Sequence, residues 1–182
     1  MRATIVLIVI NCIVYLLGEF IFDRNILFAY FGLNYLSFSG AWWQVFTTMF
    51  LHANFWHIAM NMAVLYQFGS VLERFLGSLR FAFIYLLGGI LTSVLSLAYT
   101  YFMLMHNGTV VNLVGASGAI SVLLGLLAFL DKRIRKGLVL AIFLISFIPM
   151  FLGVNVGWYA HILGFIVGYV FGKVKFGLKS RS

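Results

Sequence analysis

The residues of this chain that could do chemistry lie in its most apolar stretches. They are His57, Asn61, Ser117 and His161. Ser117 lies in a run of small residues, Gly115-Ala116-Ser117-Gly118-Ala119, and His161 precedes Gly164 and Gly168 on what would be one face of a helix. A serine hydroxyl becomes a nucleophile when an imidazole lies within hydrogen-bond reach to take its proton. These residues therefore predict attack by Ser117 on a carbonyl, with His161 as the base.

The supporting groups for this chemistry are donors rather than acids. Glu19, Asp23, Glu73 and Asp131, the four acidic residues, all fall at the ends of apolar runs. We therefore expect a serine–histidine dyad and no Ser-His-Asp triad. An oxyanion needs donors that are fixed in advance. His57 and Asn61 are one helical turn apart and can both donate, and the backbone N–H of Ser117 is a third candidate because early helical N–H groups lack intrahelical partners.

The composition determines which elements must position these residues. The chain has 182 residues, of which 64% are hydrophobic and 9% charged, and its mean hydropathy is +1.09. A soluble domain of this length needs more polar surface, so we predict a single all-α integral membrane domain over residues 1–182. The net charge of +8 would suggest a nucleic-acid partner in a soluble protein. Here the basic residues lie at the ends of apolar runs, so membrane topology explains them and no nucleic-acid partner is expected.

Six apolar runs predict six transmembrane helices, since each span needs roughly 20 apolar residues. The runs are Ala3–Phe22, Phe55–Leu72, Phe81–Met105, Gly115–Leu130, Gly137–Leu152 and Val156–Val174. Ile26–Leu51 is aromatic but interrupted by polar residues and glycine, which predicts a membrane-associated loop between the first two helices. All Lys and Arg residues except Arg24 fall on one side, so the positive-inside rule places both termini in the cytoplasm. A seventh span with the N-terminus outside would also satisfy this rule, and it leaves the later spans in the same orientation.

The four candidate residues share one depth in this arrangement. The second, fourth and sixth runs all start at the outer surface, and each candidate lies within about two turns of the start of its run. Taken singly, each has a plainer interpretation, because a Gly-x-Ser-Gly in a membrane helix is usually a packing motif and a lone histidine is as often an internal hydrogen-bond partner. Three helices placing their strongly polar groups in one layer indicates a site. No metal or organic cofactor is implied, since His52 and His57 do not stack and no carboxylate or thiolate completes a metal site.

With these residues the chain resembles the rhomboid intramembrane serine proteases, in their compact six-helix bacterial form. The matching elements are His57-Ile58-Ala59-Met60-Asn61, Gly115-Ala116-Ser117-Gly118 and Ala160-His161-Ile162-Leu163-Gly164, together with His52 and Glu73-Arg74. The resemblance covers essentially the whole chain. It implies a Ser117–His161 dyad, with His57 and Asn61 supporting the oxyanion. It also implies a bacterial inner membrane location and single-span membrane proteins as substrates, cut near the outer face.

The sequence departs from that family's usual pattern at two positions. Gln44 follows Trp43 where the family usually has an arginine, and Ser121 stands where a tyrosine often packs beneath the histidine.

Two rival functions remain open. One is a catalytically inactive rhomboid-like protein that binds membrane clients, although this chain keeps both dyad residues. The other is a small transporter or channel, which would more naturally carry charges at mid-membrane. The natural substrate and the oligomeric state are not indicated by the sequence.

Overall fold

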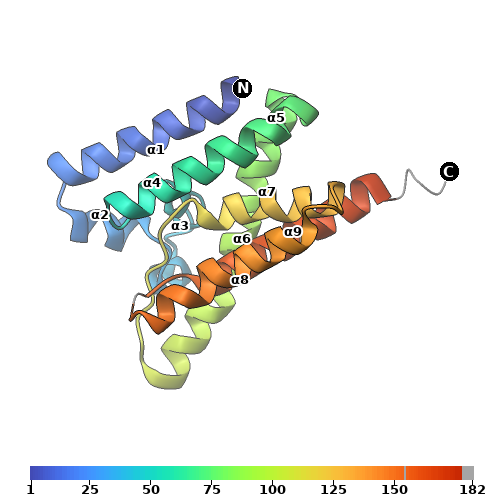
Figure 1. The fold of residues 1–182 in the computed structure, drawn as a ribbon. Coiled ribbons are helices and arrows are strands. Elements are labelled where there is room, and N and C mark those ends of the chain that lie inside the picture. The colour runs from blue at the N-terminus through green and yellow to red at the C-terminus, as the bar shows by residue number, and fades with distance from the viewer. Residues whose placement is uncertain (154, 178–182) are drawn as a thin grey trace.

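The computed structural model describes residues 1–153 and 155–177, and it forms an all-α bundle (Figure 1). Its long helices are α1 (Arg2–Phe20), α6 (Ser78–Asn107), α7 (Ser117–Leu130), α8 (Arg135–Phe151) and α9 (Trp158–Gly177). A continuous helical run is formed by α4 (Phe55–Val64), the π-helical turn η3 (Leu65–Gly69) and α5 (Ser70–Leu76). Across the described residues, the only β pairing is an isolated bridge between Leu33 and Leu113.

These elements confirm the prediction of an all-α membrane bundle, and each predicted apolar run overlaps one long helix or the continuous run of α4 to α5. Three helices in the described part of the chain, α1, α6 and α9, are individually long and apolar enough to cross a bilayer. The other helices are shorter, with 14 residues in α7 and 17 in α8, so the number of six spans stays a prediction. Two basic residues of the tail, Lys179 and Arg181, lie outside the described residues.

The local sequence explains where key helices begin and end. Gly77 has φ +82°, a conformation that glycine adopts without steric cost, and it separates α5 from α6 so that α6 starts in a new direction. α6 then crosses the other helices at a steep angle (Figure 1). At the start of α4 the side chain of Asn54 accepts a hydrogen bond of 2.9 Å from the backbone N–H of His57. This cap fixes His57 in the first turn of α4.

The segment between α1 and α4 is more helical than the predicted loop. It contains α2 (Arg24–Phe31), the 3-10 turn η1 (Tyr35–Ser39), the short α3 (Gln44–Thr47) and the 3-10 turn η2 (Thr48–Phe50). The fully buried side chain of Gln44 ties these pieces together. Its amide donates to the carbonyls of Ala29 and Tyr30, and its oxygen accepts from the hydroxyl of Ser37 at 2.7 Å. A neutral amide therefore makes the polar contacts of this loop at the position where the resembled family usually carries an arginine.

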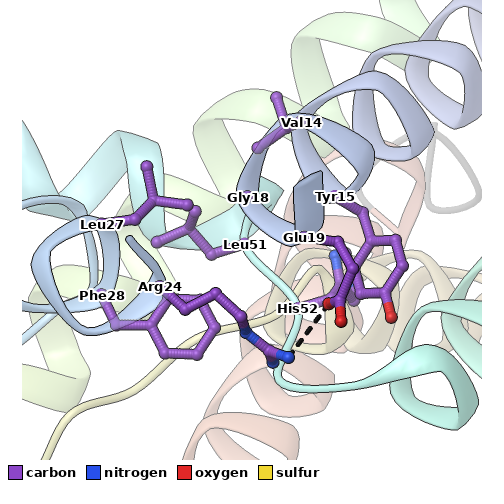
Figure 2. Close-up of a pocket in the computed structure, with 9 residues that line it drawn as sticks. All are labelled: Val14, Tyr15, Gly18, Glu19, Arg24, Leu27, Phe28, Leu51 and His52. Carbon is purple, nitrogen blue, oxygen red and sulfur yellow. Dashed lines mark hydrogen bonds and ion pairs between the residues drawn. The ribbon is translucent and has the colours of Figure 1, made fainter. Parts of the chain in front are cut away.

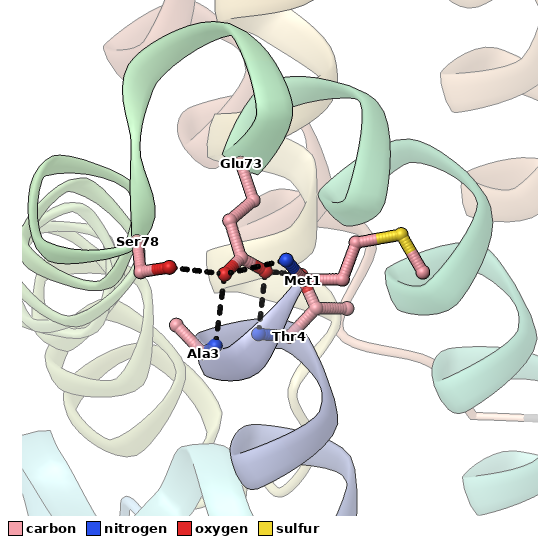
Figure 3. Close-up of polar contacts among 5 residues, drawn as sticks. All are labelled: Met1, Ala3, Thr4, Glu73 and Ser78. Atoms are coloured by element: carbon pink, nitrogen blue, oxygen red, sulfur yellow. Dashed lines mark hydrogen bonds and ion pairs between the residues drawn. The ribbon is translucent and has the colours of Figure 1, made fainter.

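The start of α1 and the end of α5 meet at one end of the bundle, through the buried carboxylate of Glu73 (Figure 3). This carboxylate accepts hydrogen bonds of 2.9 Å from the backbone N–H groups of Ala3 and Thr4, and of 2.6 Å from the hydroxyls of Thr4 and Ser78. Glu73 thus caps the first turn of α1, whose N–H groups have no partner within their own helix. The ring of Phe75 lies 6.3 Å from that of Phe176, so the end of α9 lies at the same end of the bundle.

Candidate active site

Ser117 and His161 are brought together at the starts of two packed helices. Ser117 is the first residue of α7, and His161 lies in the first turn of α9. Nε2 of His161 is 2.9 Å from Oγ of Ser117, which is hydrogen-bond distance. His161 is buried, while Ser117 is partly exposed. The pair therefore has the geometry that a base-activated serine nucleophile requires.

Glycines make this pairing possible, because they let the backbones of α7 and α9 touch. A Cβ placed on Gly164 would lie 2.4 Å from the carbonyl oxygen of Gly118, and one placed on Gly168 would lie 1.8 Å from that of Val122. On the other helix, a Cβ on Gly125 would lie 2.0 Å from the carbonyl oxygen of Phe165. No side chain other than hydrogen fits at these positions. The glycines that the sequence places on the same face as His161 therefore form the contact between the two helices that carry the pair.

The second ring nitrogen of His161 faces a residue that the sequence did not single out. Nδ1 is 3.3 Å from the hydroxyl oxygen of Ser146, a fully buried residue of α8. Ser121, which occupies the position of the family's frequent tyrosine, does not bond the ring in this way. Its hydroxyl donates to the backbone carbonyl of Ser117 at 2.7 Å, one turn back on its own helix.

An extended segment leads into Ser117 and carries a turn that requires glycine. Gly115 has φ +130°, and its N–H donates to the carbonyl of Thr48 at 3.0 Å. Earlier in this segment Leu113 exchanges two backbone hydrogen bonds of 2.9 Å with Leu33. The segment between α1 and α4 thus fixes the backbone just before Ser117. A Cβ on Gly115 would lie 2.8 Å from both Nε2 and Cε1 of the His57 ring and 3.6 Å from Oγ of Ser117, so His57 lies directly beside the pair.

The hydrogen bonds of His57 determine which of its nitrogens carries the proton. The backbone N–H of Ala53 donates to Nδ1 of His57 at 3.3 Å. In a neutral ring, Nδ1 is then the acceptor, and Nε2 carries the hydrogen. Nε2–H is the side of the ring that faces Gly115. His57 is consequently available as a donor beside Ser117.

Asn61 lies one turn further along α4 and is buried. Its side-chain amide donates to the backbone carbonyl of His57 at 2.8 Å, which leaves its second N–H free to act elsewhere. The structure therefore gathers Ser117, His161 and His57 at one place, whereas the described contact of Asn61 is with its own helix.

His52, the remaining histidine near the site, is buried behind His57, with ring centroids 5.1 Å apart. Figure 2 shows it in a small pocket beside Tyr15 and the ion pair of Glu19 and Arg24, whose charged atoms are 3.0 Å apart. The Arg24 guanidinium also donates to the carbonyl of Ala53, next to the peptide N–H that bonds His57. Among the described residues, no group of three or more His, Cys, Asp or Glu side chains could hold a metal ion.

Comparison with known proteins gives concordant matches. The sequence profile of the rhomboid domain matches residues 39–177. The rhomboid protease GlpG of Haemophilus influenzae is 24% identical over 190 aligned positions, which cover 100% of this chain and 94% of GlpG. YdcA of Bacillus subtilis is 28% identical over 146 residues, covering 76% of this chain and 70% of YdcA. The rhomboid protease GluP of Bacillus subtilis is 36% identical over 103 residues, which are 57% of this chain and 18% of GluP.

Proposed function

Because this chain belongs to the rhomboid family, whose similar members GlpG and GluP are named as proteases, we propose that it is an intramembrane serine endopeptidase. Ser117 is the nucleophile and His161 the general base. The observation that carries this proposal is the distance of 2.9 Å between Oγ of Ser117 and Nε2 of His161. A family member that only bound its clients would have no need of this pairing.

The proposed reaction proceeds through an acyl-enzyme. Oγ of Ser117 attacks the carbonyl carbon of the scissile peptide while its proton passes to Nε2 of His161. The tetrahedral intermediate collapses as His161 returns this proton to the leaving amine, which departs with the C-terminal part of the substrate. His161 then takes a proton from a water molecule that attacks the ester. The second tetrahedral intermediate then collapses, His161 returns the proton to Oγ of Ser117, and the new carboxylate is released.

The donors for the oxyanion come from the starts of α4 and α7. Nε2–H of His57 faces Gly115 beside Ser117, and the bond from Ala53 to Nδ1 holds the ring in this donor form. The backbone N–H of Ser117 is at the first position of its helix, where no intrahelical carbonyl is available. Asn61 would contribute its second amide N–H once substrate is bound. Donors that are fixed before the reaction stabilise the oxyanion without reorganisation.

The substrates we propose are single-span membrane proteins, cut in or near their transmembrane segment. Helix ends that carry basic residues, at Arg2, Arg74 and Arg80, meet at the end of the bundle where Glu73 caps α1. The positive-inside rule makes that end cytoplasmic. Ser117 and His161 then lie toward the outer face of the proposed location, a bacterial inner membrane, with both termini in the cytoplasm.

The test is cleavage of a fluorescently labelled single-span substrate by purified protein in liposomes. Wild type should cleave, and Ser117→Ala and His161→Ala should each lose at least about 1,000-fold in rate. A fluorophosphonate probe should label wild type but not Ser117→Ala. Absence of both cleavage and labelling in wild type would instead favour an inactive, client-binding member of the family. Labelling of Ser117 without cleavage would mean that an active enzyme had been offered the wrong substrate.

A further inference from the structure

The buried face of α8 ends in a polar residue at the depth of the dyad. Its buried side chains are Leu138, Ile142 and Ser146, spaced four residues apart and therefore stacked on one face of the helix. Ser146 is fully buried and is the one polar residue on this face. A polar side chain inside an apolar membrane helix is costly unless it has a partner. The partner that the structure gives it is Nδ1 of His161, at 3.3 Å.

The roles of the two ring nitrogens follow from the proposed chemistry. Nε2 of His161 must be unprotonated to accept the proton of Ser117, so the proton of the neutral ring is on Nδ1. Nδ1–H then donates to Oγ of Ser146. The reverse arrangement, with the hydroxyl of Ser146 donating to Nδ1, would place the proton on Nε2 and block the base. With Ser146 as the acceptor, the contact holds the ring in the tautomer that the reaction needs.

We propose that Ser146 is a positioning residue that holds the His161 ring in its reactive tautomer and orientation from α8. This inference rests on the proposed function. Ser146 touches neither substrate nor reacting atoms in this role, and Nδ1 keeps its proton throughout the reaction. In soluble serine proteases a carboxylate does this work. A neutral hydroxyl avoids burying a charge in the membrane, and it supplies the orientation that Ser121 does not, since Ser121 bonds the carbonyl of Ser117.

The experiment compares full-length wild type with Ser146→Ala and Ser146→Thr in liposomes. Ser146→Ala should lower kcat about tenfold and change KM by less than about twofold, because one hydrogen bond to the base is lost and no substrate contact is touched. The rate of fluorophosphonate labelling at Ser117 should fall by a similar factor. Ser146→Thr keeps the hydroxyl and should recover most of the activity. The matched control is Ser70→Ala, which removes the same atom from another buried serine, on α5, and it should leave kcat unchanged.

Three results would overturn the inference while leaving the proposed function intact. One is a Ser146→Ala enzyme that cleaves and labels as fast as wild type. Another is a loss that Ser146→Thr fails to restore although both variants unfold at the wild-type temperature. The third is a loss that Ser70→Ala reproduces. Failure of wild type itself to cleave or label would be a different outcome, because it removes the proposed function on which the inference rests.

Discussion

Gly168 of α9 lies directly against the backbone of Val122 on α7, so closely that a Cβ on Gly168 would be 1.8 Å from the Val122 carbonyl oxygen. The Cα of Gly168 and the carbonyl of Val122 both belong to helix backbones, so no flexible side chain can move aside to make room for a Cβ. The contact lies along the same helix pair that joins Ser117 to His161. The spacing of the two helices and the geometry of the dyad are therefore set together.

Gly168→Ala should push α9 away from α7. We expect it to destabilise the protein by about 1–3 kcal/mol, the usual cost of overpacking, and to slow cleavage because the dyad separates. The measurement is thermal unfolding in detergent beside the liposome cleavage assay. Gly137→Ala, on α8, is the control, since a Cβ on Gly137 would meet no other atom within 4 Å. Equal melting temperatures for the two variants would show that the helices are not in contact at Gly168.

Gly115→Ala should act on the chemistry more than on the fold. The new Cβ would be forced against the His57 ring, at 2.8 Å from its Nε2, in a backbone conformation that alanine rarely adopts. Displacing a donor to the oxyanion typically costs about 100-fold in kcat, and we expect a loss of that order.

Gly108→Ala separates backbone strain from collision with His57. Gly108 also has positive φ, +68°, but a Cβ there meets nothing within 4 Å. Its replacement should cost about 1 kcal/mol of stability and leave kcat unchanged. If Gly115→Ala instead retained wild-type kcat, His57 would have no part in stabilising the oxyanion.

Much of the fold and of the site followed from the sequence, for identifiable reasons. Apolar runs of membrane length predict helices, and a stripe of small residues predicts which helices touch. Those two patterns, together with the shared depth of the polar residues in their runs, predict Ser117 of one helix beside His161 of another. Each depends only on residues close together in the sequence.

The parts that the sequence did not reveal depend on contacts between distant residues. Ser146 is a single serine in an apolar run, and nothing in that run tells whether it faces lipid or His161. Glu73 was expected at the end of a run among other charged residues, yet it is 2% exposed and caps α1 from a distance of about 70 residues along the chain. The donor form of His57 depends on the N–H of Ala53. Partners of this kind become visible only once the helices are placed.

Gln44→Leu should loosen the segment between α1 and α4. The substitution keeps the volume of a buried side chain but removes its contacts to Ala29, Tyr30 and Ser37. The carbonyls of Ala29 and Tyr30 keep hydrogen bonds from Asn34 and Trp43, but the buried N–H of Asn34 loses its acceptor. An unpartnered buried polar group costs about 1–3 kcal/mol, so we expect a loss of that size and faster proteolytic cutting within residues 24–50. Ser37→Ala removes only one of these bonds and should have a much smaller effect. A Gln44→Leu protein as resistant to proteolysis as wild type would refute the role of this amide.

His52 gives the protein a predictable response to acid. It lies between η2 and α4, where burial lowers its pKa from 6.5 to about 3, with the neighbouring His57 acting in the same direction. The folded state thus disfavours the charged ring. The neutral His52 ring therefore contributes its full stability to the folded state above the unfolded pKa of 6.5. This contribution is lost progressively as the pH falls from 6.5 toward 3.

The melting temperature of wild type should therefore fall between pH 7 and pH 4. His52→Gln cannot charge, so its melting temperature should fall less over the same range, even if it is lower at pH 7. The titratable or charged groups around His52 are the neutral imidazole of His57 and the ion-paired side chains of Glu19 and Arg24. Glu19→Gln, which breaks the ion pair of Glu19 with Arg24, serves as the control, because it changes a nearby charge but leaves the buried imidazole in place. Parallel curves for wild type and His52→Gln would assign the acid sensitivity to another group.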